Sequence, residues 1–350
     1  MSDSEKAKKI ACSVMSIWLS AFIYVKSDDY LGEKNREWNE ACNNFDQLNM
    51  ADWVKAHDGY RSYEESWGFV SWGKVLVCTN TQLFYDLIFA DASALMCITL
   101  ALIALPLMVS IILEAGRKDA SGFFLTIPLA FWLLIQQFSM PLAFPLFWLP
   151  SYFFARGTGS IAPARIFASL PMAAPALVLT ILAFYLDPRT QNWASCVAFL
   201  GGPAICMTPT FITSIQHPDD SQGENIEARK KRSRKLTAFI YGITGIICLF
   251  TWIWLIFLTV IPKHGFDAPA VVFKAVWTEA RPTLKVKTLE ALTLWLSGIL
   301  FIGFQNMRAG VEAFFLSFFF GPGAALSLAL AGVAVDDDKV DIDSSKEKKE

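Results

Sequence analysis

The amino-acid sequence predicts an all-α, polytopic integral membrane protein, a bundle of eight or nine transmembrane helices. Of the 350 residues, 54% are hydrophobic and only 18% are charged, whereas a soluble domain usually carries about 25% charged residues. The charges gather in separate tracts, and the segments between them approach the ~20 apolar residues that a helix needs to cross a bilayer. These segments are continuously apolar without a period of two, so they predict helices rather than barrel strands.

Residues 1–25 are predicted to form an N-terminal anchor helix. The apolar run from Ile10 to Val25 follows lysines at positions 6, 8 and 9 and precedes Lys26. A cleaved signal peptide is the competing interpretation. No small-x-small cleavage site follows the run directly, which favours an uncleaved anchor.

Residues 26–86 are predicted to be a polar, tryptophan-rich loop at the membrane interface. Apolar and aromatic residues recur here at helical spacing, which indicates short helices lying on the membrane surface, and amphipathic tryptophan rings suit that position. Two of the seven cysteines, Cys42 and Cys78, share this tract. They can form a disulfide if the tract faces an oxidising lumen.

Residues 87–335 are predicted to be the transmembrane helical core. Its apolar spans are Leu87–Leu113, Phe123–Phe154, Ile166–Leu186, Trp193–Ile215, Thr237–Ile261, Leu289–Phe304 and Val311–Val335. The second of these contains four prolines, and as one straight helix it would be ~48 Å long, too long for a ~30 Å hydrocarbon core. It is therefore either one long kinked helix or two short spans that meet near Ser139-Met140-Pro141.

The orientation follows from the basic segment 229–235, which lies in a predicted cytoplasmic loop, residues 216–236. Clusters of Lys and Arg next to a span stay on the cytoplasmic side of the membrane. Two crossings by the 123–154 segment place the amino terminus in the cytoplasm, which suits its lysines, whereas one crossing places it outside; we prefer two. We expect the endoplasmic reticulum membrane as the location, and a disordered acidic tail at residues 336–350.

Two carboxylates, Asp86 and Asp91, are the candidate catalytic residues. A carboxylate inside a span is costly unless it is paired, protonated or faces a cavity. A buried carboxyl has a raised pKa and can stay protonated at neutral pH, as a general acid must. Five residues apart on a helix, the two side chains point about 140° away from each other, so they need not share one site. The alternative is that Asp86 caps the helix and Asp91 bonds a neighbouring helix.

The candidate substrate-binding residues are Trp132, Gln136, Gln137, Trp148 and Tyr152. The two glutamines are adjacent inside an apolar run, so at least one should face protein or a cavity; hydrogen bonding between helices is the alternative. Aromatic residues make up 14% of the chain, and they are dense around the prolines of this region. Their electron-rich faces attract cations and can shelter a carbocation from water, although ordinary packing also explains each single ring.

Several functions are disfavoured by the sequence. The formal net charge of −2 does not suggest nucleic acid as a partner, and the three histidines and seven cysteines lack metal-ligand spacing. The run Asp337-Asp338-Lys339-Val340-Asp341 spells the DDxxD motif of some terpene enzymes, but it lies in the charged tail without an apolar wall. No phosphate-binding, dinucleotide-binding, hydrolase or zinc-protease motif is present. We therefore expect no metal and no cofactor.

Three stretches of the core resemble a known family: Gln137 followed by Pro141-Leu142-Ala143-Phe144-Pro145-Leu146-Phe147-Trp148, the pair of spans from Ala162-Pro163-Ala164-Arg165 to Asp187-Pro188, and Phe320-Gly321-Pro322-Gly323-Ala324-Ala325. Together they resemble the fungal polytopic membrane-bound terpene cyclases of the ascochlorin-cyclase type and the membrane proteins of paxilline and indole-diterpene clusters. Two features depart from that pattern. Phe147 stands where Tyr is common, and the last span ends in Ala331-Gly332-Val333-Ala334-Val335 rather than in Trp and Arg.

The resemblance implies a metal-independent terpene cyclase of fungal secondary metabolism. Its substrate would be a hydrophobic prenylated small molecule, a meroterpenoid or indole-diterpene intermediate, often as its epoxide. Asp91 or Asp86 would protonate the epoxide or alkene, and Trp132, Trp148 and Tyr152 would face the cation. Two other classes stay open: a transporter of such a metabolite, with a hinge at residues 141–150, and a scaffold that gathers other pathway enzymes. The departures also leave open a relative with a changed role.

Overall fold

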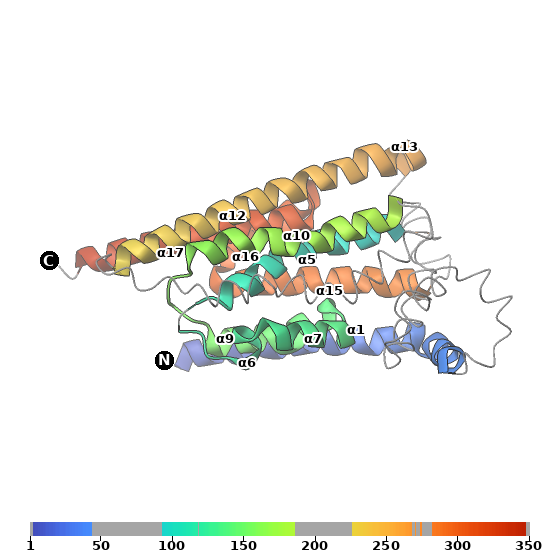
Figure 1. Ribbon diagram of the computed structural model, residues 1–350, viewed down its shortest axis with the longest axis horizontal. Coiled ribbons are helices and arrows are strands. Elements are labelled where there is room, and N and C mark those ends of the chain that lie inside the picture. The colour runs from blue at the N-terminus through green and yellow to red at the C-terminus, as the bar shows by residue number, and fades with distance from the viewer. Residues whose placement is uncertain are drawn as a thin grey trace.

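The computed structural model describes residues 3–43, 93–117, 119–185, 226–267, 270, 274 and 282–347. Every regular element in these ranges is a helix, so the all-α prediction is confirmed for this part of the chain. The long helices run alongside one another in an elongated bundle (Figure 1). Among the described residues, five helices are long and apolar enough to cross a membrane: Asp3–Gly32, Ala94–Glu114, Pro163–Leu182, Ile226–Leu258 and Pro282–Gln305.

Helix α5 (Ser93–Glu114) is the centre of the bundle. It packs against α10 (Pro163–Tyr185), α15 (Pro282–Gln305) and α17 (Pro322–Glu347). Its residues from Leu105 to Glu114 are all buried. A helix that is apolar on all sides is stable only where protein or lipid covers its faces. Here the neighbouring helices cover the near-continuous Leu, Ile, Val and Met of this segment.

The long helix α12 (Ile226–Trp254) packs along α17 and continues through η4 (Leu255–Val260), α13 (Ile261–His264) and η5 (Gly265–Asp267). Its start differs from the predicted loop 216–236, because the basic segment is already helical. A tertiary contact holds this start in place: Ser233 is buried, and its Oγ accepts a hydrogen bond of 3.0 Å from the Ile161 backbone N–H. This bond ties the first turns of α12 to the linker before α10.

The segment 123–155 is a helical hairpin. Its prolines had left open one long kinked helix or two short segments, and the structure has two arms that meet at Ser139. One arm is α6 (Phe123–Thr126) and α7 (Pro128–Phe138); the other is α8 (Met140–Ala143), η3 (Phe144–Trp148) and α9 (Leu149–Ala155). The chain reverses at Ser139, which has φ 63 and ψ 156. The hairpin ends meet where the Ser121 N–H donates to the Ala155 carbonyl at 3.3 Å. Both ends therefore lie at one end of the bundle.

A second hairpin replaces the single predicted span 311–335. Helix α16 (Met307–Phe320) and α17 are separated by Gly321, which has φ 83, a value that favours glycine. The following Pro322 suits the first turn of a new helix because it lacks an N–H. A Cβ at Gly323 would collide with the carbonyl oxygen of Leu102 in α5. The Gly-Pro-Gly sequence thus has a structural role in the turn and in close helix packing.

Helix α1 (Asp3–Asn43) runs beside α15 and the second arm of the first hairpin. It continues well beyond residue 25, where the sequence predicts the end of the anchor helix. At its start, Lys8 Nζ donates to the Phe304 carbonyl at 2.7 Å, which places the amino terminus beside the end of α15. At the other terminus, α17 remains helical to Glu347, into the segment predicted to be a disordered tail.

Candidate functional site

Five of the seven predicted site residues cannot be placed. Asp86 and Asp91 lie outside the described residues. Helix α7 carries Trp132, Gln136 and Gln137, but their side chains also lie outside the described part of the structure. The roles of these five residues therefore stay predictions, and only Trp148 and Tyr152 can be followed further.

Trp148 and Tyr152 form part of a buried aromatic column. Their ring centroids are 5.2 Å apart with an interplanar angle of 14°, and Trp148 stacks in the same way on Phe144, at 5.0 Å and 15°. The three residues are four positions apart, so one helical face presents all three rings. Phe301 of α15 meets the column edge-on, 4.8 Å from Tyr152 and 5.3 Å from Trp148. Stacked and edge-to-face contacts are both favourable for aromatic quadrupoles.

The two polar atoms of this column lack partners within the described residues. Both side chains are fully buried, and neither the Trp148 Nε1 nor the Tyr152 hydroxyl makes a hydrogen bond there. Buried polar atoms are nearly always hydrogen-bonded, because leaving one unsatisfied costs about 1–3 kcal/mol. The sequence predicted both residues for their ring faces; the structure adds two buried hydrogen-bonding groups.

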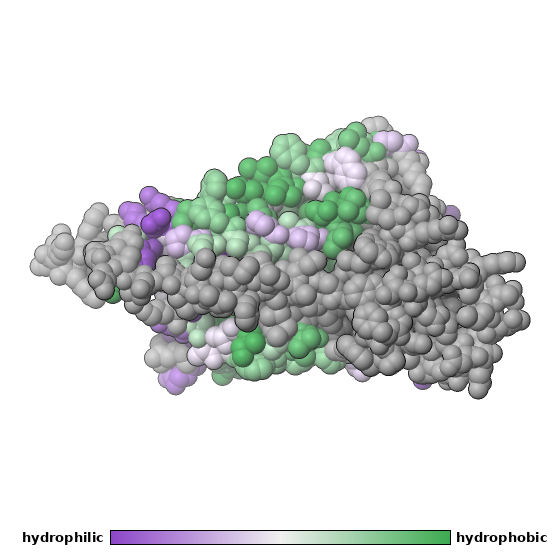
Figure 2. Space-filling model, viewed as in Figure 1, coloured by the Kyte–Doolittle hydropathy of each residue, from purple (hydrophilic) through white to green (hydrophobic). Residues whose placement is uncertain are grey.

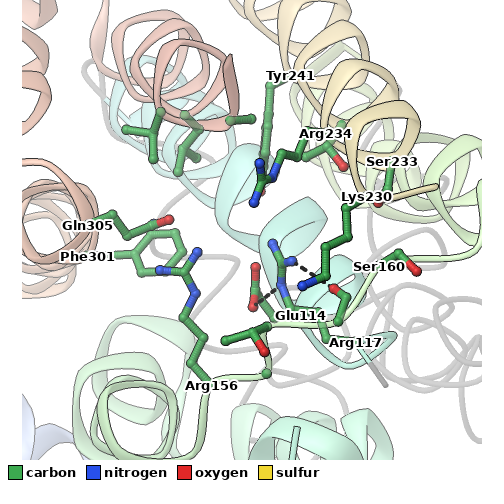
Figure 3. A pocket seen from close by; sticks show the side chains of 17 residues that line it. Glu114, Arg117, Arg156, Ser160, Lys230, Ser233, Arg234, Tyr241, Phe301 and Gln305 are labelled. Atoms are coloured by element: carbon green, nitrogen blue, oxygen red, sulfur yellow. Dashed lines mark hydrogen bonds and ion pairs between the residues drawn. The ribbon is translucent and has the colours of Figure 1, made fainter. Parts of the chain in front are cut away.

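A polar pocket of 340 Å³ adjoins the aromatic column. Phe301 belongs to both, since it contacts Tyr152 and also lines the pocket. The remaining walls come from the end of α5, the linker between α9 and α10, the first turns of α12, the end of α15 and the middle of α17 (Figure 3). Five segments far apart in sequence thus meet at one end of the bundle.

An ion pair between Glu114 and Arg117 holds one wall of the pocket. Arg117 Nε donates to Glu114 Oε2 at 2.7 Å, and the two side chains are only 19% and 7% exposed. Arg117 Nη1 also donates to the Gly159 carbonyl at 3.2 Å, which fastens the linker before α10. Burial by itself lowers the pKa of the Arg117 guanidinium, but the Glu114 carboxylate outweighs it and raises that pKa above its usual range.

The opposite side of the pocket is basic. Lys230 and Arg234 lie one turn apart on α12, and Arg156 follows the end of α9. Figure 3 shows the nitrogen ends of these three side chains and of Arg117 directed toward a common space. The lining therefore contains four cations and a single carboxylate. Arg156 also lies 5.4 Å from the centre of the Tyr152 ring, a cation–π contact that joins the pocket to the column.

Sequence reasoning missed the residues of this pocket. Glu114, Arg117 and Arg156 stand just beyond the ends of apolar runs, where charged residues are ordinary, so nothing singled them out. The useful signal was their number: an acid and two arginines flank the same proline-rich segment, and a basic cluster precedes the span after residue 236. Within the described residues no group of three or more metal-ligating side chains comes together.

Comparison with known proteins does not identify a family for this chain. The chain matches no family model, and no curated protein or solved structure is significantly similar to it.

Proposed function

We propose that the protein is an integral membrane enzyme that cyclises a hydrophobic prenylated small molecule. The membrane part of the proposal rests on apolar surface. Large side chains such as Phe250, Leu258 and Phe319 are exposed, and an apolar band covers the middle of the bundle, with hydrophilic residues toward the end that carries both termini (Figure 2). Water-soluble monomers rarely expose apolar patches above a few hundred Å².

The proposed topology has six crossings and two re-entrant hairpins. Both hairpins, 123–155 and 307–335, enter and leave at the pocket end of the bundle. The apolar parts of their arms have roughly 16 residues or fewer and measure about 24 Å at most, less than a ~30 Å hydrocarbon core. Helix α17 continues beyond this apolar part. The sixth crossing is the predicted span Trp193–Ile215, which lies outside the described residues. We assign the pocket end of the bundle to the cytoplasmic side, because the basic start of α12 lies there. The amino terminus lies at the same end and is therefore also cytoplasmic. The membrane is that of the endoplasmic reticulum.

The proposed reaction is an acid-initiated cyclisation without metal or cofactor. A carboxyl group, Asp91 or Asp86, donates a proton to the epoxide oxygen and the C–O bond breaks. A double bond of the prenyl chain then attacks the cation, and loss of a proton ends the sequence. No atom is gained or lost overall. These roles follow from the resemblance to membrane terpene cyclases.

The observation that carries the proposal is the aromatic column. Trp148 and Tyr152, predicted from sequence as a wall facing a cation, stack in the bundle core, and Arg156 already lies over the Tyr152 ring. The face of Tyr152 that Trp148 does not cover therefore attracts positive charge. Its unpartnered hydroxyl and indole N–H offer two further groups to a polar atom of the substrate.

The test is conversion of an epoxidised prenyl-aromatic substrate by microsomes that contain the protein. The expected product is a cyclised isomer of unchanged mass. Asp91→Asn or Asp86→Asn should lower the rate by about 10²–10⁴-fold, as expected for loss of a general acid. Tyr152→Leu should lower it by roughly 30-fold, the equivalent of a ~2 kcal/mol cation–π contact. Phe319→Leu, on the exposed face of α16, is the matched control and should convert normally.

Two outcomes would oppose this assignment. Parental rates in both aspartate variants would show that neither carboxyl group is the acid. Parental rates in Tyr152→Leu would show that the column does not face the reacting cation.

Transport is the second candidate, favoured by one observation. Two helical hairpins break at Ser139 and Gly321, and interrupted helices commonly form substrate sites in transporters. A transporter would move the labelled, unconverted metabolite across proteoliposomes. The cyclase would instead change the metabolite's skeleton without net transfer.

A further inference from the structure

The pocket at the cytoplasmic end of the bundle has an unusual charge balance. Arg117, Arg156, Lys230 and Arg234 line it together with one carboxylate, Glu114, which is already paired with Arg117. Cations held close together repel one another, and the repulsion grows where protein replaces water around them. An anion between them would remove that repulsion and add charge-assisted hydrogen bonds.

The cations are held in place by the surrounding structure. Arg117 is fixed by Glu114 and by the Gly159 carbonyl. The face of α12 that carries Lys230 and Arg234 is fixed by the bond from the Ile161 N–H to Ser233. Gly157 lies so close to the loop after α5 that a Cβ there would be 2.7 Å from the Ala120 nitrogen. A preorganised set of donors binds with a smaller loss of conformational entropy.

We propose that this pocket binds a phosphate-class anion, either the phosphorylated headgroup of a membrane lipid or a soluble phosphate or diphosphate. Guanidinium groups match phosphate oxygens with parallel N–H donors, and three of the four cations are arginines. Hydroxyls of Ser160 and Thr237 also line the space. Its 340 Å³ exceeds by far the ~30 Å³ of one water molecule, so a diphosphate or a headgroup has room. The site does not depend on the proposed cyclisation.

The experiment uses the full-length protein and separates the two sources of phosphate. In the soluble arm, inorganic pyrophosphate is titrated into protein in phosphatidylcholine nanodiscs and the heat of binding is measured. In the lipid arm, native mass spectrometry measures retention of phosphatidylinositol phosphate against phosphatidylcholine. Neither arm requires turnover, so failure of the proposed cyclase and failure of this site are distinguishable.

Matched variants on one helix decide whether the pocket is responsible. Lys230→Met and Arg234→Met remove cations that line the pocket, whereas Lys231→Met and Arg232→Met remove exposed cations next to them. All four make the same change in net charge. The pocket variants should weaken binding by about 10–100-fold, and the controls by no more than about threefold. Lys230→Arg, which keeps the charge, should retain binding and shows whether loss in Lys230→Met reflects folding.

Each outcome has a defined meaning. Pyrophosphate binding that the pocket variants lose supports a soluble ligand, and lipid retention alone supports a headgroup. Absence of binding in both arms, or equal losses in the pocket and control variants, would overturn the proposal.

Discussion

Glu114→Gln should lower the stability of the protein and raise its affinity for anions. The substitution keeps the shape of the side chain and removes the charge that Arg117 contacts at 2.7 Å. Loss of one partner from a buried ion pair typically costs about 3–5 kcal/mol, because the other charge stays buried. Arg117 is 19% exposed and keeps its bond to the Gly159 carbonyl, so we expect the low end of this range, about 3 kcal/mol.

The anion affinity should change in the opposite direction. Glu114 is the one carboxylate among the residues that line the pocket. Without its charge, pyrophosphate should bind about tenfold more tightly, or ~1.4 kcal/mol, a modest fraction of the Coulomb energy at such distances. Bound pyrophosphate should then recover part of the lost stability, since a ligand of the native state stabilises it by mass action.

The assay is reversible unfolding in mixed detergent micelles, with and without pyrophosphate, for Glu114→Gln, Arg117→Met and the double variant. The double variant should be more stable than the sum of the two single losses predicts, because it leaves no charge unpaired. Unchanged stability in Glu114→Gln would refute the ion pair as a support of the wall. A fall in pyrophosphate affinity would refute the electrostatic account of the pocket.

Three further predictions concern packing and backbone. Gly323→Ala should destabilise the bundle by about 1–3 kcal/mol, because its methyl group collides with the Leu102 carbonyl; Gly332→Ala, in open space on the same helix, should be neutral or stabilising in the same unfolding assay. Ser139→Gly should raise stability by ~1 kcal/mol through relief of its positive φ, and a loss would contradict that strain. Tyr152→Phe should preserve stability, since the hydroxyl has no described partner, but it should slow cyclisation. A Tyr152→Phe variant that is less stable yet cyclises at the parental rate would give the hydroxyl a structural role instead.

The secondary structure class and the position of most long helices could be predicted from the sequence alone. Continuous apolar runs bounded by charged residues are enough to predict them, because whether a segment forms an apolar helix depends on the composition of that segment alone. The limits of the runs were less predictable. The basic start of α12 is helical because Ser233 meets Ile161, residues 72 positions apart, and no local pattern reports such a contact.

The reversals at Ser139 and Gly321 depended on tertiary structure for a related reason. Proline and glycine mark a break in a helix, but the direction of the chain after the break is set by what the second arm packs against. Around Gly321 this is the packing against Trp252 and Leu102. In the segment 123–154 the sequence predicted an interruption, and only the fold distinguished a kink from a hairpin. The reversal at Gly321 was not predicted, because residues 311–335 were expected to form one span.

The sequence by itself determined the all-helical character of the described residues and the apolar runs, five of which form helices long and apolar enough to cross a membrane. It also singled out Trp148 and Tyr152 as aromatic candidates, and only the structure stacked them on one another. The basic pocket was decided by the tertiary structure. Arg117 and Arg156 stand at the ends of different apolar runs, and Lys230 belongs to a basic cluster that indicates only orientation, so none of them marks a pocket in the sequence. Their charges interact because they lie close together in space, and only the folded bundle brings them to one 340 Å³ cavity.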